Sequence, residues 1–593
     1  MTDITTIYRA AHAVYLPEDE HTPVQGPATV LVSGEQITAV FDEQEAELPD
    51  EFTYTDATVV EVPDDQVLIP GLVDTHVHVN EPGRTEWEGF ASVTRAAAAG
   101  GVTTLLDMPL NSIPSTVTVD ALDAKQDVAA PKSKVNVGFW GGVVPENLGT
   151  GDLRALWDRG VFGFKCFLLH SGVDEFQPLS TGQLRQVMTE IAEFDGLLIV
   201  HAEDADEIAT GEAKVDAAGG IDETFDSFLA SRPSSAEAKA IATVIEAAEA
   251  TGCRAHILHL SDSGSIDQIA AARDRGVRIT AETCPHYLAL FSEEIQNGAT
   301  QYKCCPPVRT AGNRERLWKG LVDGVISTVV SDHSPCTAEL KKFAEVADAQ
   351  ASANERNELT AFSALAATGN DLGAGGADGR GSGGSFGEAW GGIGSVQLGL
   401  PVVWSQARLR GLSLADVIGW MCQAPAEWAG LPDRGAIQEG RRADLATVSA
   451  DDAFVVLPDE LHQRNKVTAY AQRALAGVVT RTWIGGEPST SAPPPRTSPQ
   501  PTWTTTPSSP PTSAPSPSDP EDHHDRALRL PVLPRPRQPR VGRLRGVGVR
   551  RILRRAREPH HAARACLRPE RVRQQRQGLR RVGDPTPAPR RGR

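Results

Sequence analysis

The sequence lacks any long hydrophobic run, and it is poor in cysteine and in aromatic residues. No stretch of about 20 apolar residues occurs, which is the length that a membrane-spanning helix needs. The N-terminus also lacks the basic-then-apolar pattern of a secretory signal. Eight cysteines, none in a CxxC pair, do not make a disulfide framework in 593 residues. We therefore expect a cytoplasmic protein that neither spans nor binds a membrane.

Charge is distributed unevenly along the chain, although its net value is −19. From Arg526 to the end there are 22 arginines and 3 acidic residues, so the preceding part carries about −38. Because so acidic a body repels nucleic acid, we do not expect nucleic acid as a partner. Residues 489–593 form a Pro/Ser/Thr-rich linker followed by the Arg-rich end, and we expect them to be disordered. Their Arg- and Pro-rich text resembles a shifted reading frame of GC-rich coding sequence.

Short apolar runs alternate with helical stretches through the central part of the chain. This alternation is typical of parallel βα units, and eight repeats favour a closed (β/α)8 barrel of the TIM type over an open sheet. Amphipathic helices are expected between the runs, for example at residues 236–250 and 267–275. The eight runs are residues 68–80, 102–107, 135–140, 161–168, 197–203, 254–261, 277–283 and 325–332.

Both ends of the main body carry strand signals. Residues 28–41 predict a hairpin that turns at Gly34 and Glu35, and β-type runs return at residues 445–448 and 478–484. We therefore expect a small β-sandwich domain built from both ends of the chain, beside the α/β barrel. The expected division is residues 1–67 and 432–488 for the small domain, 68–431 for the barrel domain, and 343–385 for a flexible Gly- and Ala-rich insertion within it.

A row of polar side chains lies on one face of the first expected barrel strand. Residues 73–80 read VDTHVHVN, so strand alternation places Asp74, His76, His78 and Asn80 together. Barrel enzymes keep their active sites at the C-terminal ends of the strands. An isolated HxH pair is more often part of a half-solvated strand without a function. That interpretation does not account for a row of polar side chains on the interior face of a barrel strand, so we favour a functional site.

Other expected strands also end in residues that can bind metals. His201 ends one apolar run and Asp332 ends another. Residues 255–259 read AHILH, and alternation places His256 and His259 on opposite faces, so only one of them is expected to point inward. Imidazoles and a carboxylate from several strand ends form a suitable ligand set for divalent metals such as Zn²⁺.

Lys165 lies in the apolar segment VFGFKCFL, residues 161–168. Burial lowers the pKa of a lysine and favours the neutral amine. Such an amine can react with CO₂ to form a carbamate, whose two oxygens can bridge a pair of metal ions. The segment leaves two alternatives open, in which Lys165 reaches solvent or pairs with a carboxylate.

Together these motifs resemble the amidohydrolase superfamily, and within it the cyclic amidases: allantoinases, hydantoinases or dihydropyrimidinases, and dihydroorotases. The resemblance covers about residues 5–488. The matching segments are PGLVDTHVH (70–78), GFK (163–165), HAE (201–203), HLS (259–261), ETCPHYL (282–288) and SDHSPC (331–336).

The resemblance implies a centre of two divalent metal ions. Zn²⁺ is the first expectation, with Co²⁺, Mn²⁺, Ni²⁺ or Fe²⁺ as alternatives, and CO₂ is needed to make N6-carboxylysine at Lys165. A hydroxide held between the ions would attack the substrate, with Asp332 as general acid and base. His256, His286 and His333 receive no ligand role. The implied ligands are His76, His78, carbamylated Lys165, His201, His259 and Asp332.

Segments near these ligands narrow the choice of substrate. Dihydroorotases carry an arginine at the position of Asn80, where it binds the substrate carboxylate. Four other segments look like allantoinase: EPGRTEWEG (81–89), MPLNS (108–112), KCCPPVR (303–309) and AWGGI (389–393). The resemblance thus implies hydrolysis of allantoin to allantoate in purine catabolism, by a homotetramer. A hydantoinase or dihydropyrimidinase, and a non-catalytic hydantoinase-like scaffold, stay open as alternatives. The expected substrate contacts are Asn80, Arg84, Asn111 and Cys305.

Overall fold

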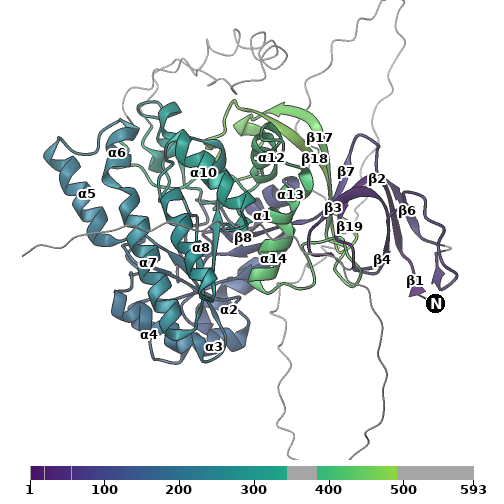
Figure 1. Ribbon diagram of the computed structural model, residues 1–593, viewed down its shortest axis with the longest axis horizontal. Helices are drawn as coiled ribbons and strands as arrows, with labels where there is room; N and C mark the ends of the chain where they lie inside the picture. Colours follow the sequence, from purple (N-terminus) through teal and green to yellow (C-terminus); the bar gives the residue numbers. More distant parts are fainter. Residues whose placement is uncertain (1, 19, 55, 344–383, 490–593) are drawn as a thin grey trace, which may run out of the picture. The chain divides into compact units, whose positions relative to one another are not determined.

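The computed structural model (Figure 1) describes residues 2–18, 20–54, 56–343 and 384–489. The expected flexible insertion lies outside these residues except for positions 343, 384 and 385, and the expected disordered tail lies outside them except for position 489. Within the described ranges, no helix is long and apolar enough to cross a bilayer.

The central strands are parallel and are joined by helices, so the fold is of the α/β class. Strands β8 to β10 form one sheet and β11 to β16 another, each with neighbours in chain order. The N–H of Trp140, between β10 and β11, donates to the carbonyl of Asp107 at 3.0 Å, and that of Phe162 donates to Phe139 at 3.0 Å. The strands are β8 (Leu72–Val77), β9 (Val102–Asp107), β10 (Asn136–Phe139), β11 (Gly141–Gly142), β12 (Phe164–Phe167), β13 (Leu197–His201), β14 (Arg254–Ile257), β15 (Ile279–Thr283) and β16 (Thr328–Val329).

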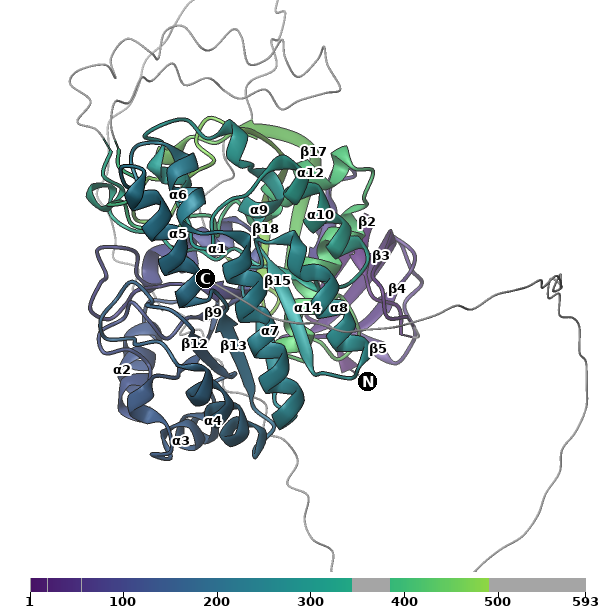
Figure 2. The ribbon, with the colours of Figure 1, turned by 60° about the vertical axis from the view of Figure 1, so that its left-hand side comes forward.

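Helices pack against these strands: α3 contacts β11, α4 contacts β13 and α7 contacts β14, and Figure 2 shows α4 and α7 beside β13. The two helices expected near residues 236–250 and 267–275 are confirmed as α7 and α8. The helices are α1 (Phe90–Ala99), α2 (Val119–Ala129), α3 (Asp152–Arg159), α4 (Thr181–Ala192), α5 (Ala205–Ala217), α6 (Phe225–Ser231), α7 (Ser234–Thr251), α8 (Ile266–Asp274), α9 (Pro285–Ala289), α10 (Ala311–Val322), α12 (Gly399–Leu409), α13 (Leu414–Ile418) and α14 (Ala424–Ala429).

Strand alternation divides the apolar side chains between two buried clusters. On β9, Leu105 belongs to the large cluster that includes helix residues, whereas Leu106 belongs to a smaller cluster with Trp140 and Ile199. Both faces of the parallel strands are therefore buried, which explains why their sequences read as continuous apolar runs.

Strands from both ends of the described chain form one outer sheet, drawn in purple and green at the right of Figure 1. Its order is β19-β18-β17-β7-β2-β3-β4, with β6 (Thr58–Glu61) also paired to β2. The predicted hairpin is confirmed as β3 and β4, which are antiparallel. The remaining bounds are β1 (Thr2–Asp3), β2 (Thr6–Tyr15), β3 (Val24–Ser33), β4 (Gln36–Phe41), β5 (Phe52–Thr53), β7 (Val67–Pro70), β17 (Leu445–Val455), β18 (Ala474–Ile484) and β19 (Glu487–Pro488).

The run of residues 68–80, expected as one strand, is two strands separated by Gly71. β7 pairs with β17 in the outer sheet, whereas β8 begins the parallel strands. A Cβ atom at Gly71 would lie 2.1 Å from Oγ1 of Thr103, so any larger residue would require Thr103 or the backbone to shift. Apolar periodicity could not predict the change of sheet, because both strands are fully buried.

Candidate metal centre

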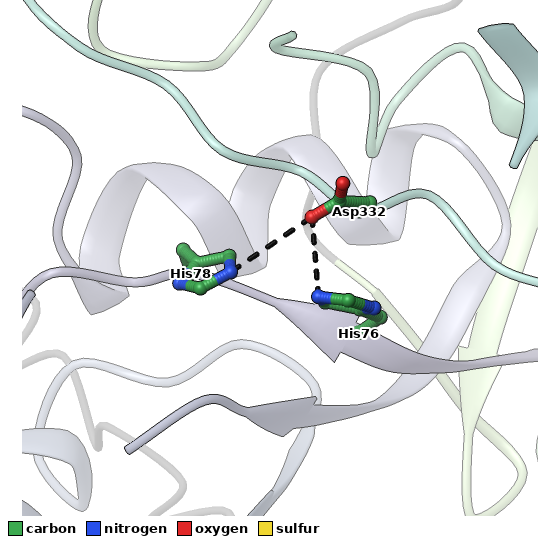
Figure 3. Close-up of side chains that lie close together, drawn as sticks. All are labelled: His76, His78 and Asp332. Atoms are coloured by element: carbon green, nitrogen blue, oxygen red, sulfur yellow. Dashed lines mark ion pairs between the residues drawn. The ribbon is translucent and has the colours of Figure 1, made fainter. Parts of the chain in front are cut away.

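Four histidines and one aspartate lie together at the C-terminal ends of the parallel strands. The ring centroids are 5.5 Å apart for His76 and His78, 5.4 Å for His76 and His259, and 4.5 Å for His201 and His259. Oδ1 of Asp332 lies 3.1 Å from Nε2 of His76 and 3.8 Å from Nε2 of His78 (Figure 3). Side chains predicted from separate strands therefore meet in one buried cluster.

The ring atoms of this cluster are suited to hold a metal ion. Nε2 of His76 and Nδ1 of both His78 and His259 are buried and make no hydrogen bond. Burial, and then the nearby Lys165 charge, keeps the pKa of His76 and of His78 well below the usual range, so both rings are neutral. Neutral imidazoles with free lone pairs are the form that binds metals. Ligand atoms of His76, His78 and Asp332 lie within 4.8 Å of one another, so these residues fit a divalent ion.

Lys165 lies on β12 with only 1% of its surface exposed, so it does not reach solvent. Its Nζ is 4.9 Å from the centre of the Phe167 ring. Burial lowers the pKa of Lys165, whereas the charges of Asp332 and Glu282 oppose that shift. The Lys165 amine therefore lies close enough to Asp332 and Glu282 for their charges to affect its pKa. The alternation of β12 could not predict these neighbours, because they come from other strands.

His201 is oriented by Glu203, which also forms a part-buried ion pair with Arg232. Its Nε2 lies 2.7 Å from Oε2 of Glu203, and Nη1 of Arg232 lies 2.7 Å from the same oxygen. Burial acts to raise the pKa of Glu203, but Arg232 and His201 together bring it down to about 2. The carboxylate is therefore ionised and engages Nε2, which leaves Nδ1 as the ring nitrogen of His201 that could bind a metal.

His256 and His259 both face the interior, which corrects the expectation that only one of them could. Strand β14 ends at Ile257, and His259 has a φ of 35°, so strand alternation does not continue to it. His256 does not join the cluster directly, because its Nε2 lies 3.0 Å from Oε2 of Glu282. Burial raises the pKa of Glu282 to about 8, against the His259 N–H and the Lys165 charge.

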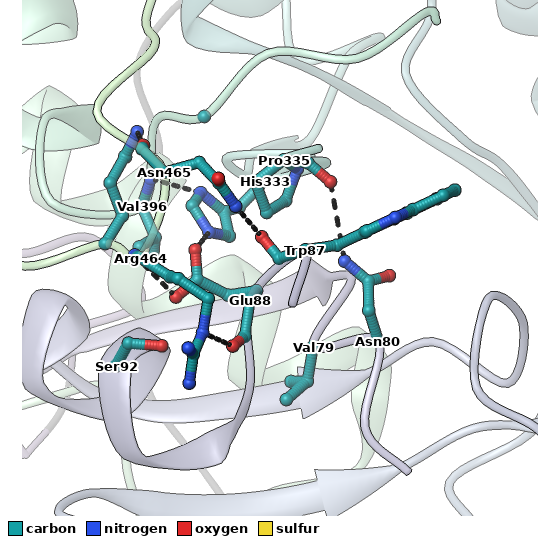
Figure 4. A network of polar contacts seen from close by, with 12 residues as sticks. Val79, Asn80, Trp87, Glu88, Ser92, His333, Pro335, Val396, Arg464 and Asn465 are labelled. Carbon is teal, nitrogen blue, oxygen red and sulfur yellow. Dashed lines mark hydrogen bonds and ion pairs between the residues drawn. The ribbon is translucent and has the colours of Figure 1, made fainter. Parts of the chain in front are cut away.

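Two further histidines of the sequence motifs are also buried. Nε2 of His333 lies 3.2 Å from Oε2 of Glu88, and its Nδ1 accepts from the N–H of Ser395 at 3.0 Å (Figure 4). Both ring nitrogens of His286 lack hydrogen-bond partners, and one of them lies within 4.8 Å of ligand atoms of Cys284 and Asp332. The residue type alone gave no indication of these different surroundings.

The four expected substrate contacts have different surroundings. Asn80 has a φ of 66°, and its Oδ1 is buried without a hydrogen-bond partner. Arg84 is engaged by protein groups, because its Nη1 donates to the carbonyl of Asn111 at 2.8 Å and lies 2.5 Å from Glu175. Cys305 is partly buried and precedes a cis proline.

Three residues around the cluster were missed by sequence reasoning: the buried Glu203 and Glu282, and the partly buried Arg232. Glu203 is two residues after His201, so alternation could have placed it on the same face. Glu282 opens a matching segment but carried no role. Arg232 gave no signal, because it reaches Glu203 from the end of a helix 29 residues away.

A parallel α/β fold with histidines and an aspartate at the strand ends is the architecture of metal-dependent hydrolases. Residues 67–488 match the amidohydrolase family, and the chain belongs to that family. It is 47% identical to the allantoinase of Streptomyces avermitilis, over 82% of this chain and 96% of that protein. It is 37% identical to the allantoinase of Saccharomyces cerevisiae, over 79% of this chain and 93% of that protein. The fold is similar to that of the solved L-hydantoinase (dihydropyrimidinase) from Arthrobacter aurescens, with a TM-score of 0.68 and 26% identity. The match covers 82% of this chain and 96% of that protein.

Proposed function

We propose that this protein is an allantoinase, which hydrolyses the cyclic amide of allantoin to give allantoate. The observation that carries hydrolysis is the buried cluster of neutral imidazoles around Asp332 and Lys165. The similarity to allantoinases identifies the substrate, since it extends from a bacterium (47% identity) to a plant, Arabidopsis thaliana (39%), and a yeast (37%).

Members of this family typically bind divalent metals, and we propose a pair of them here, with Zn²⁺ first and Co²⁺, Mn²⁺, Ni²⁺ or Fe²⁺ as alternatives. Lys165 takes part as its carbamate, made with CO₂. Bound ions lower the pKa of water toward about 7, which makes it a nucleophile at neutral pH. The proposed ligands are His76, His78, Lys165, His201, His259 and Asp332.

Asp332 is the proposed general acid and base. Its side chain keeps 10% of its surface exposed, whereas that of His76 has none, so a substrate can reach the carboxylate. Asp332 accepts a proton from the attacking water and delivers it to the ring nitrogen that leaves. Asn80, Arg84, Asn111 and Cys305 remain the proposed substrate contacts, and the unpartnered Oδ1 of Asn80 supports a polar contact there.

We further infer that the parallel strands close into an eight-stranded barrel, with β10 and β11 counted as one strand. The support is the hydrogen bond at 2.8 Å from the N–H of His78, after β8, to the carbonyl of His333, after β16. The small β-sandwich domain of residues 1–67 and 432–488, the barrel domain of residues 68–431, the homotetramer and the cytoplasmic location also stand as proposals.

The direct test is an assay of allantoin conversion to allantoate, combined with the metal content of protein expressed with zinc and bicarbonate. We expect turnover together with about two metal ions per chain, as a two-metal site requires. Protein that binds no metal and opens no ring would instead be a non-catalytic scaffold.

The second candidate is a hydantoinase or dihydropyrimidinase, because the solved L-hydantoinase has a similar fold. Comparing kcat/KM for allantoin with kcat/KM for dihydrouracil separates the two functions. Faster opening of dihydrouracil would overturn the proposed substrate and leave the proposed metal site intact.

A further inference from the structure

We infer that Glu282 and His256 are positioning residues that orient His76 toward the metal ions, an inference that rests on the proposed metal site. Glu282 lies on β15, His256 on β14 and His76 on β8, so the contact joins three strands. All three side chains are fully buried. Neither Glu282 nor His256 is among the proposed ligands.

The Glu282 carboxylate is the centre of this contact. Its Oε1 lies 2.5 Å from Nδ1 of His76, and its Oε2 lies 3.0 Å from Nε2 of His256. Oε1 also accepts from the backbone N–H of His259 at 3.2 Å. One side chain therefore contacts a ring of one proposed ligand and the backbone of another.

These contacts fix where the ring protons lie. The backbone N–H of His259 can only donate, so Oε1 of Glu282 is an acceptor, and Nδ1 of His76 is placed to direct its N–H at the same oxygen. The proton of His76 is then on Nδ1, and its Nε2 presents a lone pair toward Asp332, 3.1 Å away. This is the tautomer that a metal ligand needs, and an outer carboxylate that fixes it strengthens metal binding.

The surroundings of His256 hold it in the matching orientation. Its Nδ1 lies 2.7 Å from Oγ1 of Thr280, whose hydroxyl can donate to it. Its ring is stacked on Trp428, with centroids 3.9 Å apart and planes at 7°. With Nδ1 occupied as an acceptor, the proton of His256 lies on Nε2 and points at Glu282. His256 thus acts on the metal site through Glu282.

The test measures metal affinity by titrating Zn²⁺ and Co²⁺ into metal-free full-length protein against a competing chelator. In Glu282→Gln one carboxyl oxygen is replaced by an NH₂ group that cannot accept, so the side chain no longer accepts from His76 and His256 together and the fixed orientation of the His76 ring is weakened. We expect the affinity to fall about 10- to 100-fold and the Co²⁺ absorption spectrum to change. His256→Phe keeps a ring to stack on Trp428 but removes the donor, and we expect a smaller fall.

The matched control is Glu88→Gln, which makes the same change at an equally buried glutamate that also contacts a histidine, His333. It should leave the metal affinity unchanged. The effect of His256→Phe should also disappear in the Glu282→Gln background. If Glu282→Gln does not fold, a fall in His256→Phe that is absent in Glu88→Gln supports the inference.

The outcomes separate this inference from the proposed function. Unchanged affinity in both Glu282→Gln and His256→Phe, or equal losses in the Glu88→Gln control, would overturn the positioning role alone. Wild-type protein that binds no metal would overturn the proposed function itself.

Discussion

Lys165 illustrates at the residue scale how burial changes the chemistry of a side chain. A charged amine is costly in an apolar interior, so burial lowers its pKa and increases the fraction that can react with CO₂. The proposed carbamate would restore a charge, but a negative one that metal ions could neutralise. On this proposal the buried side chain is unfavourable as a charged amine and becomes favourable as a carbamate beside metal ions.

Replacing Lys165 with alanine should abolish allantoin turnover, because the proposed carbamate cannot form. Acetate or propionate added with metal should restore part of the activity, since a free carboxylate can enter the space left by the side chain. Initial rates with and without the added acid measure this effect. A fully active Lys165→Ala protein would contradict the bridging role.

Lys125 offers a matched control for that experiment. It is also 1% exposed, but its Nζ pairs with Asp107 at 2.7 Å. Any activity lost in Lys125→Ala comes from loss of the ammonium group that pairs with Asp107, so added carboxylic acids should not restore it.

At the scale of elements, the junction between β7 and β8 joins the outer sheet to the sheet of β8, β9 and β10. Gly71 passes against Thr103 at the start of β9, and its N–H donates to the carbonyl of Asp444 at 2.8 Å. Gly71, the single residue between the two strands, therefore contacts both Asp444, which precedes β17 of the outer sheet, and Thr103 of the parallel strand β9.

Gly71→Ala should destabilise the protein by about 1–3 kcal/mol, because the new methyl group forces Thr103 or the backbone to shift. Urea unfolding with a fitted free energy measures the change. Gly182→Ala in α4 is the control, since a Cβ there meets no atom within 4 Å and should not reduce stability. Equal stability of Gly71→Ala and wild type would show that the crossing has room to adjust.

Local patterns predicted those parts of the fold and the site that depend on near neighbours in sequence. The run at residues 102–107 matches β9 residue for residue, and the strand-end positions predicted the convergence of His76, His201 and Asp332. Gly71 divides what reads as one apolar run, because sheet membership depends on distant partners. Glu282 was missed for the same reason, since its contact with His76 joins residues 206 apart.

At the scale of the whole molecule, the family match ends at residue 488, and no sequence motif lies beyond it. A chain ended after Pro488 should therefore retain the kcat/KM for allantoin and the elution volume of the full-length protein. A large loss of either would show that residues 489–593 contribute to activity or assembly.

A chain ended after Arg473 is the contrasting control, because it removes β18, which pairs along β17 in the outer sheet. It should fail to fold, as judged by loss of soluble protein and of cooperative unfolding.

The outer sheet can be completed only late in protein synthesis, because it pairs strands from both ends of the described chain. β7 pairs with β17 along four residues, and about 375 residues separate the two strands. At the ~5–20 residues per second of translation, β7 leaves the ribosome roughly 20–75 s before its partner does. During that time it presents an unpaired apolar edge that other nascent chains can join. Newly made copies of this protein should therefore depend on chaperones until the last strands of the sheet have been synthesised.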